Sequence, residues 1–196
     1  MLLDSTMQLQ SNIIIVGNGS SLLEKENGHL IDQFDIVVRF NEYKIKGYEK
    51  YVGTKTTYWF NTVNFQNKQN ESRMFVNYSK IFLHIWQWDI NKDPLFKSFK
   101  QFYQDRIELI KTQESTIIEI QKFVNDFSYF NYSTGAIAIW MLLKEHPKVV
   151  ITGFDWWIPN KKHHYSDNVP IGTTHKPDKE YNLISKLIEE GKVEML

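Results

Sequence analysis

Short apolar runs alternate with amphipathic stretches along the whole chain. Ile13 to Val16 is an apolar run that a glycine ends, which is typical of a buried strand. Similar runs predict further strands at 35–40, 56–60, 81–85, 107–110, 149–152 and 193–196. A helical period predicts helices at 21–24, 93–104, 116–127, 136–144 and 178–191. The polar, Asn-rich stretch 61–80 predicts a loop.

Several of these helices carry end signals. Ser21-x-x-Glu24 and Thr116-x-x-Glu119 fit capping boxes, and Asp178 is suited to cap the last helix. The inner faces predicted for the last two amphipathic helices are Ile117, Ile120, Phe123, Val124 and Phe127, and then Tyr181, Ile184, Leu187 and Ile188. Residues 136–144 are apolar nearly all round and predict a buried helix.

The alternation of strands and helices predicts an α/β fold of the Rossmann-like type. We expect a mostly parallel sheet with helices on both faces, formed by a single domain over residues 1–196. Ligands in such folds bind beyond the carboxyl ends of the strands. The turns at Gly17, Asn41, Ser133 and Gly153 all lie at or near such ends, so we expect them to converge.

Composition narrows the classes of partner. Lys plus Arg and Asp plus Glu both count 23, which argues against nucleic acid as a partner, because such binding needs a basic surplus. An anionic substrate must therefore be recognised by groups in the binding site itself and not by the overall charge of the protein. The chain has no cysteine, which excludes disulfides and thiolate metal sites. We expect no signal peptide and no transmembrane segment, and a cytoplasmic location.

The first polar turn with candidate chemistry is Gly17-Asn18-Gly19-Ser20-Ser21, between a predicted strand and a predicted helix. Glycines let a backbone approach a ligand, and free N–H groups at a helix start favour phosphate. The spacing is neither Gly-x-Gly-x-x-Gly nor a P-loop. A tight turn in which Asn18 bonds its own backbone explains the same residues, so both interpretations stay open.

The second turn, Ser133-Thr134-Gly135, opens the apolar helix. Ser and Thr are routine N-caps, and a hydroxyl at that position can also contact a phosphate. The two roles are compatible, so the motif alone does not separate them.

Three of the six histidines, His163, His164 and His175, fall within thirteen residues. They are consistent with a solvated loop, with a metal site, or with a general base and a phosphate partner. The third interpretation draws on imidazole, whose ordinary pKa of about 6.5 lets it take a hydroxyl proton at neutral pH. Glu180 lies five residues after His175 and is suited to orient it or to cap the following helix. The chain has no Asp-x-Asp pair of the kind that holds Mg²⁺ or Mn²⁺ in many nucleotide-sugar transferases.

These motifs together resemble a known family, the animal-type sialyltransferases. Residues 16–20, 31–32, 35–41, 47–49 and 52–57 resemble the large sialylmotif, and 133–154 resembles the small one. His163 to Asn168 is similar to the third motif. His175 followed by Glu180 is similar to the very small motif. All four occur in order, whereas residues 61–130 match no motif of the family.

The resemblance implies a GT-A-like fold that uses no metal or other cofactor and transfers a sugar with inversion from a CMP-activated donor. It implies that Asn18 and Asn41 contact the nucleotide and its phosphate. The remaining residues that it assigns to the nucleotide are Ser133, Thr134, Gly135 and Gly153. His164 would bind the leaving phosphate and His175 would deprotonate the acceptor hydroxyl. Gly17, Tyr165 and Glu180 would support the site, and Arg39 would organise the fold through an internal ion pair.

The sequence also departs from the family pattern. The small motif of the animal enzymes usually ends in Gly-Phe-Gly, whereas Asp155 stands in the last place here. This departure leaves open whether the donor carries sialic acid or another CMP-linked ulosonic acid such as Kdo. The acceptor is expected to be a glycan or glycolipid, with Trp86 and Trp88 as candidates on its side. Two alternatives remain open: a metal-dependent hydrolase that uses the histidines, and a non-catalytic nucleotide- or glycan-binding module.

Overall fold

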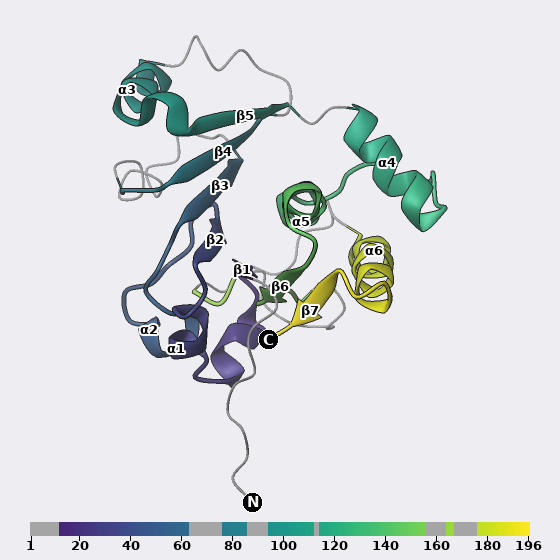
Figure 1. Cartoon of the computed structure of the whole chain (residues 1–196), viewed down its shortest axis with the longest axis horizontal. Helices are drawn as coiled ribbons and strands as arrows, with labels where there is room; N and C mark the ends of the chain where they lie inside the picture. Colours follow the sequence, from purple (N-terminus) through teal and green to yellow (C-terminus); the bar gives the residue numbers. More distant parts are fainter. Residues whose placement is uncertain (1–11, 63–75, 86–93, 112–113, 156–163, 167–175) are drawn as a thin grey trace, which may run out of the picture.

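The structure is a computed structural model, and it describes residues 12–62, 76–85, 94–111, 114–155, 164–166 and 176–196. Its strands form one seven-stranded sheet in the order β5-β4-β3-β2-β1-β6-β7, and every neighbouring pair is parallel (Figure 1). The strands are β1 (Ile13–Val16), β2 (Ile36–Phe40), β3 (Tyr58–Thr62), β4 (Lys80–Ile85), β5 (Ile107–Lys111), β6 (Val149–Thr152) and β7 (Val193–Met195). The order reverses between β1 and β6, which is where open α/β sheets bind ligands.

Helices cover both faces of the sheet, which confirms the predicted fold class (Figure 1). One face carries α4 (Glu114–Val124), α5 (Thr134–Glu145) and α6 (Pro177–Glu189). The other carries the 3-10 helix η1 (Ser20–Glu24), α1 (Gly28–Ile31), α2 (Glu49–Val52) and α3 (Pro94–Tyr103), which the 3-10 helix η4 (Gln104–Arg106) follows.

Successive side chains of a strand point to opposite faces of the sheet, so each central strand contributes to a core on either face. Ile13 and Ile15 of β1 pack in the core below α5 and α6, whereas Ile14 and Val16 pack with η1, α1 and α2. A third core, around Trp59 of β3, lies under α3. Burial of such a side chain stabilises the fold by about 1.5–3 kcal/mol, so apolar residues on both sides of a central strand hold it in place.

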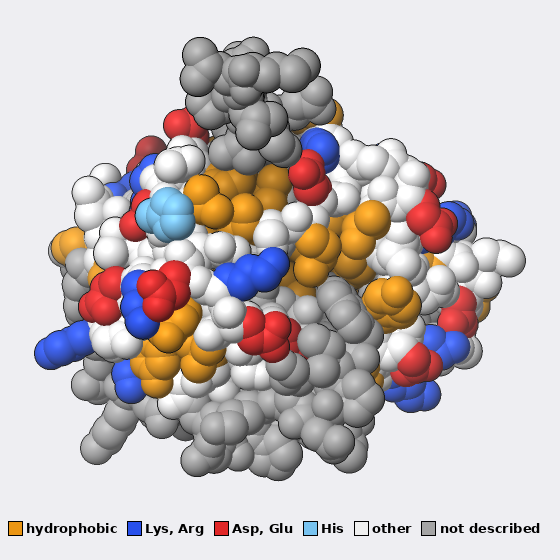
Figure 2. All heavy atoms as spheres, turned by 90° about the horizontal axis from the view of Figure 1, so that it is seen from below, with side chains coloured by type: hydrophobic (Ala, Val, Ile, Leu, Met, Phe, Trp, Pro, Cys, Tyr) orange, Lys and Arg blue, Asp and Glu red, His pale blue; other side chains and the backbone are white. Residues whose placement is uncertain are grey.

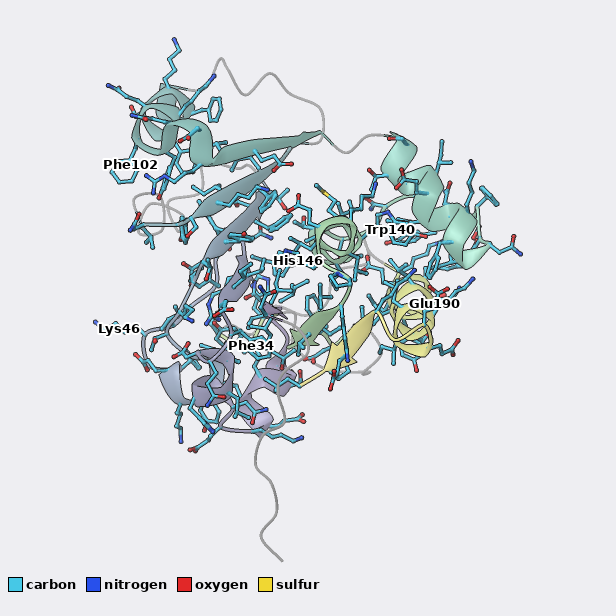
Figure 3. The ribbon with its side chains drawn as sticks, in the orientation of Figure 1. Phe34, Lys46, Phe102, Trp140, His146 and Glu190 are labelled. Carbon is cyan, nitrogen blue, oxygen red and sulfur yellow. The ribbon has the colours of Figure 1, made fainter. Side chains whose placement is uncertain are left out.

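The capping boxes predicted for the first and third helical stretches were wrong. η1 begins at Ser20 and has no side-chain cap from its own sequence, and Thr116 lies inside α4. Glu119 instead accepts hydrogen bonds from Trp140 Nε1 (3.1 Å) and Lys144 Nζ (2.7 Å), both on α5. Trp140 extends from α5 toward α4 in Figure 3. Tertiary partners therefore override a signal that is local to the sequence.

The inner faces of α4 and α6 were predicted only in part. Asn125 takes a left-handed conformation (φ 56°) after α4, so the helical period stops before Phe127, which is 62% exposed. In α6 the buried positions are Glu180, Leu183, Ile184 and Leu187, while Tyr181 and Ile188 are exposed. Asp178 does not cap this helix, because Lys176 holds the N-cap position and Pro177 is the first residue. The buried face of α6 therefore begins with the carboxylate of Glu180.

Arg39 organises the loop after α2 through hydrogen bonds to oxygen atoms of that loop, and not through the expected ion pair. Its side chain is almost fully buried, and it donates to the carbonyls of Val52 (2.5 Å) and Lys55 (3.0 Å) and to Thr56 Oγ1 (3.0 Å). Burial lowers the pKa of Arg39 from its ordinary value, although the hydroxyls around it and Asp32 act in the opposite direction. Carbonyl dipoles satisfy this guanidinium where a carboxylate was expected.

Candidate functional site

The candidate site lies at the carboxyl ends of the central strands, and the turn after β1 is packed directly on the turn after β6. Gly17 N donates to Thr152 O (2.8 Å) and Gly19 N donates to Gly153 O (2.7 Å). A Cβ on Gly17 would stand 2.3 Å from Gly153 O, so a side chain does not fit there. These two N–H groups are therefore engaged inside the protein. Close packing of the turns, and not a phosphate cradle, accounts for both glycines.

A carboxylate occupies the place where this turn was expected to receive phosphate. Asp155 Oδ2 accepts hydrogen bonds from Ser20 Oγ (3.1 Å) and from the backbone N–H of Ser21 (3.0 Å). The backbone N–H of Ser21 in η1 is therefore already engaged by a side chain of the protein. Asp155 is 7% exposed, and its second oxygen, Oδ1, has no hydrogen-bond partner.

Asn18 projects from the same turn, and it bridges β1 to β2. Its amide nitrogen donates to Phe40 O (3.3 Å), which fixes the orientation of the amide because a carbonyl accepts only from the NH₂ side. Its amide oxygen is buried and has no partner. Asn18 therefore has an unpaired acceptor, which suits a hydroxyl or amino group, and its amide nitrogen carries a second hydrogen that can donate to a ligand.

The ends of β2 and β3 join the N-terminus of α5. Asn41 has a left-handed backbone (φ 44°), and its Oδ1 accepts from Thr62 N (2.8 Å). The hydroxyls of Thr62 and Thr134 are 2.8 Å apart. Asn61, the residue before Thr62, is fully buried, and neither its amide oxygen nor its amide nitrogen has a partner. Such a group costs about 1–3 kcal/mol in the unliganded fold.

Sequence analysis placed 61–80 in a loop and so missed Asn61 and Thr62, which belong to β3. The available signal was their place directly after an apolar strand, where α/β folds carry polar ligand-binding groups. Asn is more common in turns than in strands, so the sequence pattern assigned this position to a loop and not to the end of a strand.

Ser133 connects α5 to α6 through a fully buried carboxylate. Glu180 Oε1 accepts from Ser133 N (2.7 Å), and Glu180 Oε2 accepts from Ser133 Oγ (2.7 Å). The Ser133 hydroxyl also caps α5 by accepting from Ala136 N (3.2 Å), as predicted. Its one proton is engaged by Glu180, so Ser133 Oγ has no proton left to donate to a phosphate. Glu180 therefore serves the start of α5, a role the sequence did not suggest.

Tyr129 extends this buried network toward α6. Its hydroxyl lies 3.4 Å from Glu180 Oε1 and accepts from Lys176 N (3.2 Å). Burial raises the pKa of Tyr129 above its ordinary value, so the phenol stays neutral at physiological pH. His175 is the residue before Lys176 in the sequence. It lies outside the described residues, as does His163.

Residues 164–166 close the site on the side of β1. Tyr165 is buried, and its backbone N–H donates to Asn18 O (2.7 Å). Its hydroxyl accepts from Lys44 N (2.9 Å) and donates to Lys44 O. Tyr165 therefore ties the turn after β1 to the segment after β2. His164, which precedes it, is half-buried.

The described part of the chain thus brings together Asn18, Asn41, Ser133, Thr134, Gly153 and Tyr165. Gly135 lies in the first turn of α5, next to Thr134. Across the described residues, His, Asp and Glu side chains form no group of three that could hold a metal ion. The three-histidine arrangement is not tested by this finding, because two of its members lie outside those residues.

The face of the molecule that Figure 2 shows does not gather side chains of one charge. In Figure 2, which views the molecule from below relative to Figure 1, acidic and basic side chains are interspersed. This distribution agrees with equal numbers of acidic and basic residues over the whole chain. A charged ligand would be recognised by contacts within the site and not by a long-range field.

Comparison with known proteins identifies the family. Residues 8–192 match the sequence profile of Glycosyltransferase family 29 (sialyltransferase). The chain belongs to glycosyltransferase family 29.

Similar sequences carry more than one activity in their names. The family 29 chain is 29% identical over 221 residues to a lactosylceramide alpha-2,3-sialyltransferase of Bos taurus, covering 92% of this chain and 50% of that protein. The rat protein of the same name is 30% identical over 224 residues, covering 93% and 56%. The beta-1,6-galactosyltransferase GALT29A of Arabidopsis thaliana is 26% identical over 199 residues, covering 88% and 50%. The chain therefore spans about half the length of these relatives.

Solved structures share the fold. A mammalian sialyltransferase in complex with Gal-beta-1-3GalNAc-ortho-nitrophenol has a TM-score of 0.63 at 21% identity, covering 94% of this chain and 68% of that one. Cst-I, a monofunctional alpha-2,3-sialyltransferase from Campylobacter jejuni, has a TM-score of 0.58 at 17% identity, covering 100% and 78%. In the described part of the family 29 chain, no helix is long and apolar enough to cross a membrane.

Proposed function

We propose that this chain transfers sialic acid, or a related ulosonic acid, from a CMP-activated donor to a hydroxyl of a glycan or glycolipid acceptor. The observation that carries the proposal is the convergence of the family's motif residues at one edge of the sheet. Hydrogen bonds link Tyr165 to Asn18, Asn18 to the end of β2, and Asn41 through Thr62 to Thr134. Segments that are far apart in the sequence meet at the β1/β6 switch point, where a nucleotide would bind.

The proposed reaction is a single displacement. The acceptor oxygen attacks the anomeric carbon, the bond from that carbon to the CMP phosphate oxygen breaks, and the hydroxyl proton passes to His175. Attack on the face opposite to the leaving group inverts the configuration. The growing charge on the phosphate would be met by His164 and by backbone N–H groups in the first turn of α5, where Thr134 and Gly135 lie.

The unpaired polar atoms of Asn18, Asn61 and Asp155 support a polar ligand at this edge. Each belongs to a residue at the carboxyl end of a central strand, and each atom is buried. Buried polar groups in folded proteins are nearly always paired, so unpaired ones at a strand edge are suited to a bound molecule. A sugar nucleotide offers hydroxyl and amino groups to all three.

The first test is ligand binding. Selective thermal stabilisation by CMP over UMP, GMP and AMP would support the donor class. Equal stabilisation by all four nucleotides, or by none of them, would refute it. The wild-type chain should then form a glycoside from CMP-sialic acid and a galactoside, detected by mass spectrometry. Binding without turnover of any CMP-linked acid sugar would favour the non-catalytic module.

The second test addresses the chemistry. His175→Ala should reduce transfer by about 10²–10⁴-fold with CMP affinity nearly unchanged, because a general base acts on the acceptor. Transfer should be indifferent to EDTA, since we propose a reaction without a metal. Hydrolysis without transfer, lost on chelation and recovered with a divalent cation, would favour the hydrolase alternative. The anomeric configuration of the glycoside product, read by NMR and compared with that of the donor, tests inversion. Cytoplasmic action remains a proposal, testable by cell fractionation.

A further inference from the structure

Asp155 holds a carboxylate oxygen whose partner is missing from the protein. Its Oδ2 is paired with Ser20 and Ser21, whereas its Oδ1 is just as buried and has no hydrogen-bond donor. The side chain as a whole is 7% exposed. A carboxyl oxygen withdrawn from water without a hydrogen-bond donor is unfavourable, and buried polar atoms in native folds are nearly always paired.

The surroundings hold this oxygen in a fixed place. A Cβ on Gly19 would stand 2.6 Å from Asp155 Cγ, so the carboxyl group lies directly against the turn after β1. Rotation of the carboxylate away from this turn would break its contacts with Ser20 and Ser21. Asp155 Oδ1 is therefore held in one orientation beside the turn after β1, near the point between β1 and β6 where the strand order reverses.

The chemistry of the free atom selects the part of a nucleotide that can meet it. A phosphate is anionic and offers only acceptors at neutral pH, so it does not match a carboxylate oxygen. The unpaired oxygen of Asn18, on the adjoining turn, is also an acceptor. Two acceptors together call for N–H or O–H donors, and the nucleoside half of a nucleotide carries both kinds.

We propose that Asp155 Oδ1 accepts a hydrogen bond from the nucleoside of the donor, and that this contact selects the donor nucleotide. This inference rests on the proposed use of a cytidine nucleotide. The hydrogen-bond donor is a neutral group, either the 4-amino group of cytosine or a ribose hydroxyl. This chain matches relatives whose names specify different transferred sugars. Family membership alone therefore does not determine which nucleotide the donor carries.

Asp155→Asn separates the contact from the structural role of the side chain. The amide oxygen can still accept from Ser20 and Ser21, and the amide nitrogen then stands where Oδ1 was. If cytosine is the partner, the new NH₂ group opposes its amino group and fits the carbonyl at position 4 of uracil. If ribose is the partner, its hydroxyl can accept from the new NH₂ group but loses the hydrogen bond to a charged oxygen, so the advantage of CMP over 2′-deoxy- or 3′-deoxy-CMP becomes smaller.

The experiment measures affinities of CMP, UMP, 2′-deoxy-CMP and 3′-deoxy-CMP by calorimetry for the wild type and Asp155→Asn. A hydrogen bond to a charged group corresponds to roughly a ten- to hundredfold preference, so one of the wild-type ratios should change by that factor in the variant. Asp35→Asn is the matched control, because Asp35 is exposed and precedes β2 at the opposite edge of the sheet. All ratios should be unchanged in this control.

The outcomes are distinguishable. A changed CMP-to-UMP ratio assigns the contact to the base, and a changed ratio of CMP to a deoxy analogue assigns it to the ribose. Unchanged ratios in a folded Asp155→Asn variant overturn the inference while leaving the proposed function intact. If that variant does not fold, the wild type decides, since equal affinity for all four nucleotides overturns the inference. A wild type that binds none of them overturns the proposed function as well.

Discussion

Replacement of Glu180 by Gln tests whether the buried carboxylate between α5 and α6 holds the site together. In the wild type, one oxygen accepts from Ser133 N and the other from Ser133 Oγ, both at 2.7 Å. Glutamine keeps one acceptor and converts the other to a donor. Ser133 Oγ would then face an NH₂ group while it already accepts from Ala136 N, and its own proton would lose its partner.

The magnitude follows from the lost bond. A hydrogen bond to a charged group contributes about 1.5–3 kcal/mol, and 1 kcal/mol corresponds to about 2–4 °C in a domain of this size. Glu180→Gln should therefore lower the melting temperature by roughly 3–12 °C. Because Ser133 begins α5, the affinity for CMP should fall as well, by about tenfold if one such bond positions the helix start.

The assay is calorimetric melting with and without CMP, at pH 7. Glu189→Gln is the matched control, because Glu189 lies exposed on the same helix, and it should melt with the wild type. A Glu180→Gln variant with unchanged melting temperature and CMP affinity would refute the reasoning. That result would mean that the charge of this carboxyl group does not organise Ser133.

Three further predictions concern single positions. Asn61→Leu should raise the melting temperature of the unliganded chain, because it removes a buried unpaired amide that costs about 1–3 kcal/mol, and should weaken CMP-sugar binding in calorimetry. Gly17→Ala should destabilise the fold by about 1–3 kcal/mol in denaturant titration, since its Cβ would overlap a backbone oxygen. Burial alone would raise the pKa of Asp32, but hydrogen bonds from the N–H groups of Lys55 and Thr54 hold it below its ordinary value. Its contribution to stability is therefore present above about pH 4 and lost as pH falls through the folded pKa, so Asp32→Asn should lower the melting temperature more at pH 7 than at pH 3.

The core strands were the part of the fold best predicted from the sequence. β1 and β6 begin and end at the predicted residues, because apolar runs bounded by glycine have few alternative structures. β3 was placed two residues too early, because its last two residues, Asn61 and Thr62, are polar. The apolar pattern that predicts a strand therefore ends before the strand itself does. Helix caps failed for a related reason, because their partners come from distant parts of the chain.

The candidate site was likewise predicted from the sequence only in part. The motifs predicted which turns would meet, and the structure brings them to one edge. The sequence did not predict that Asp155 would cap η1, that Glu180 would hold Ser133, or that Gly19 N would be engaged by Gly153 O. Each depends on a hydrogen bond between groups far apart in the chain, and composition and spacing carry no information on which donor meets which acceptor.

The position of β1 in the middle of the sheet has a consequence for synthesis. Ile14 pairs on one side with Val37, which emerges soon after it, and on the other with Val150, which is made much later. A nascent chain therefore leaves the ribosome with one edge of an apolar strand open until β6 is translated. Such edges recruit other strands, and non-local pairing is slow. Premature termination before β6 should yield aggregates and not a smaller active enzyme.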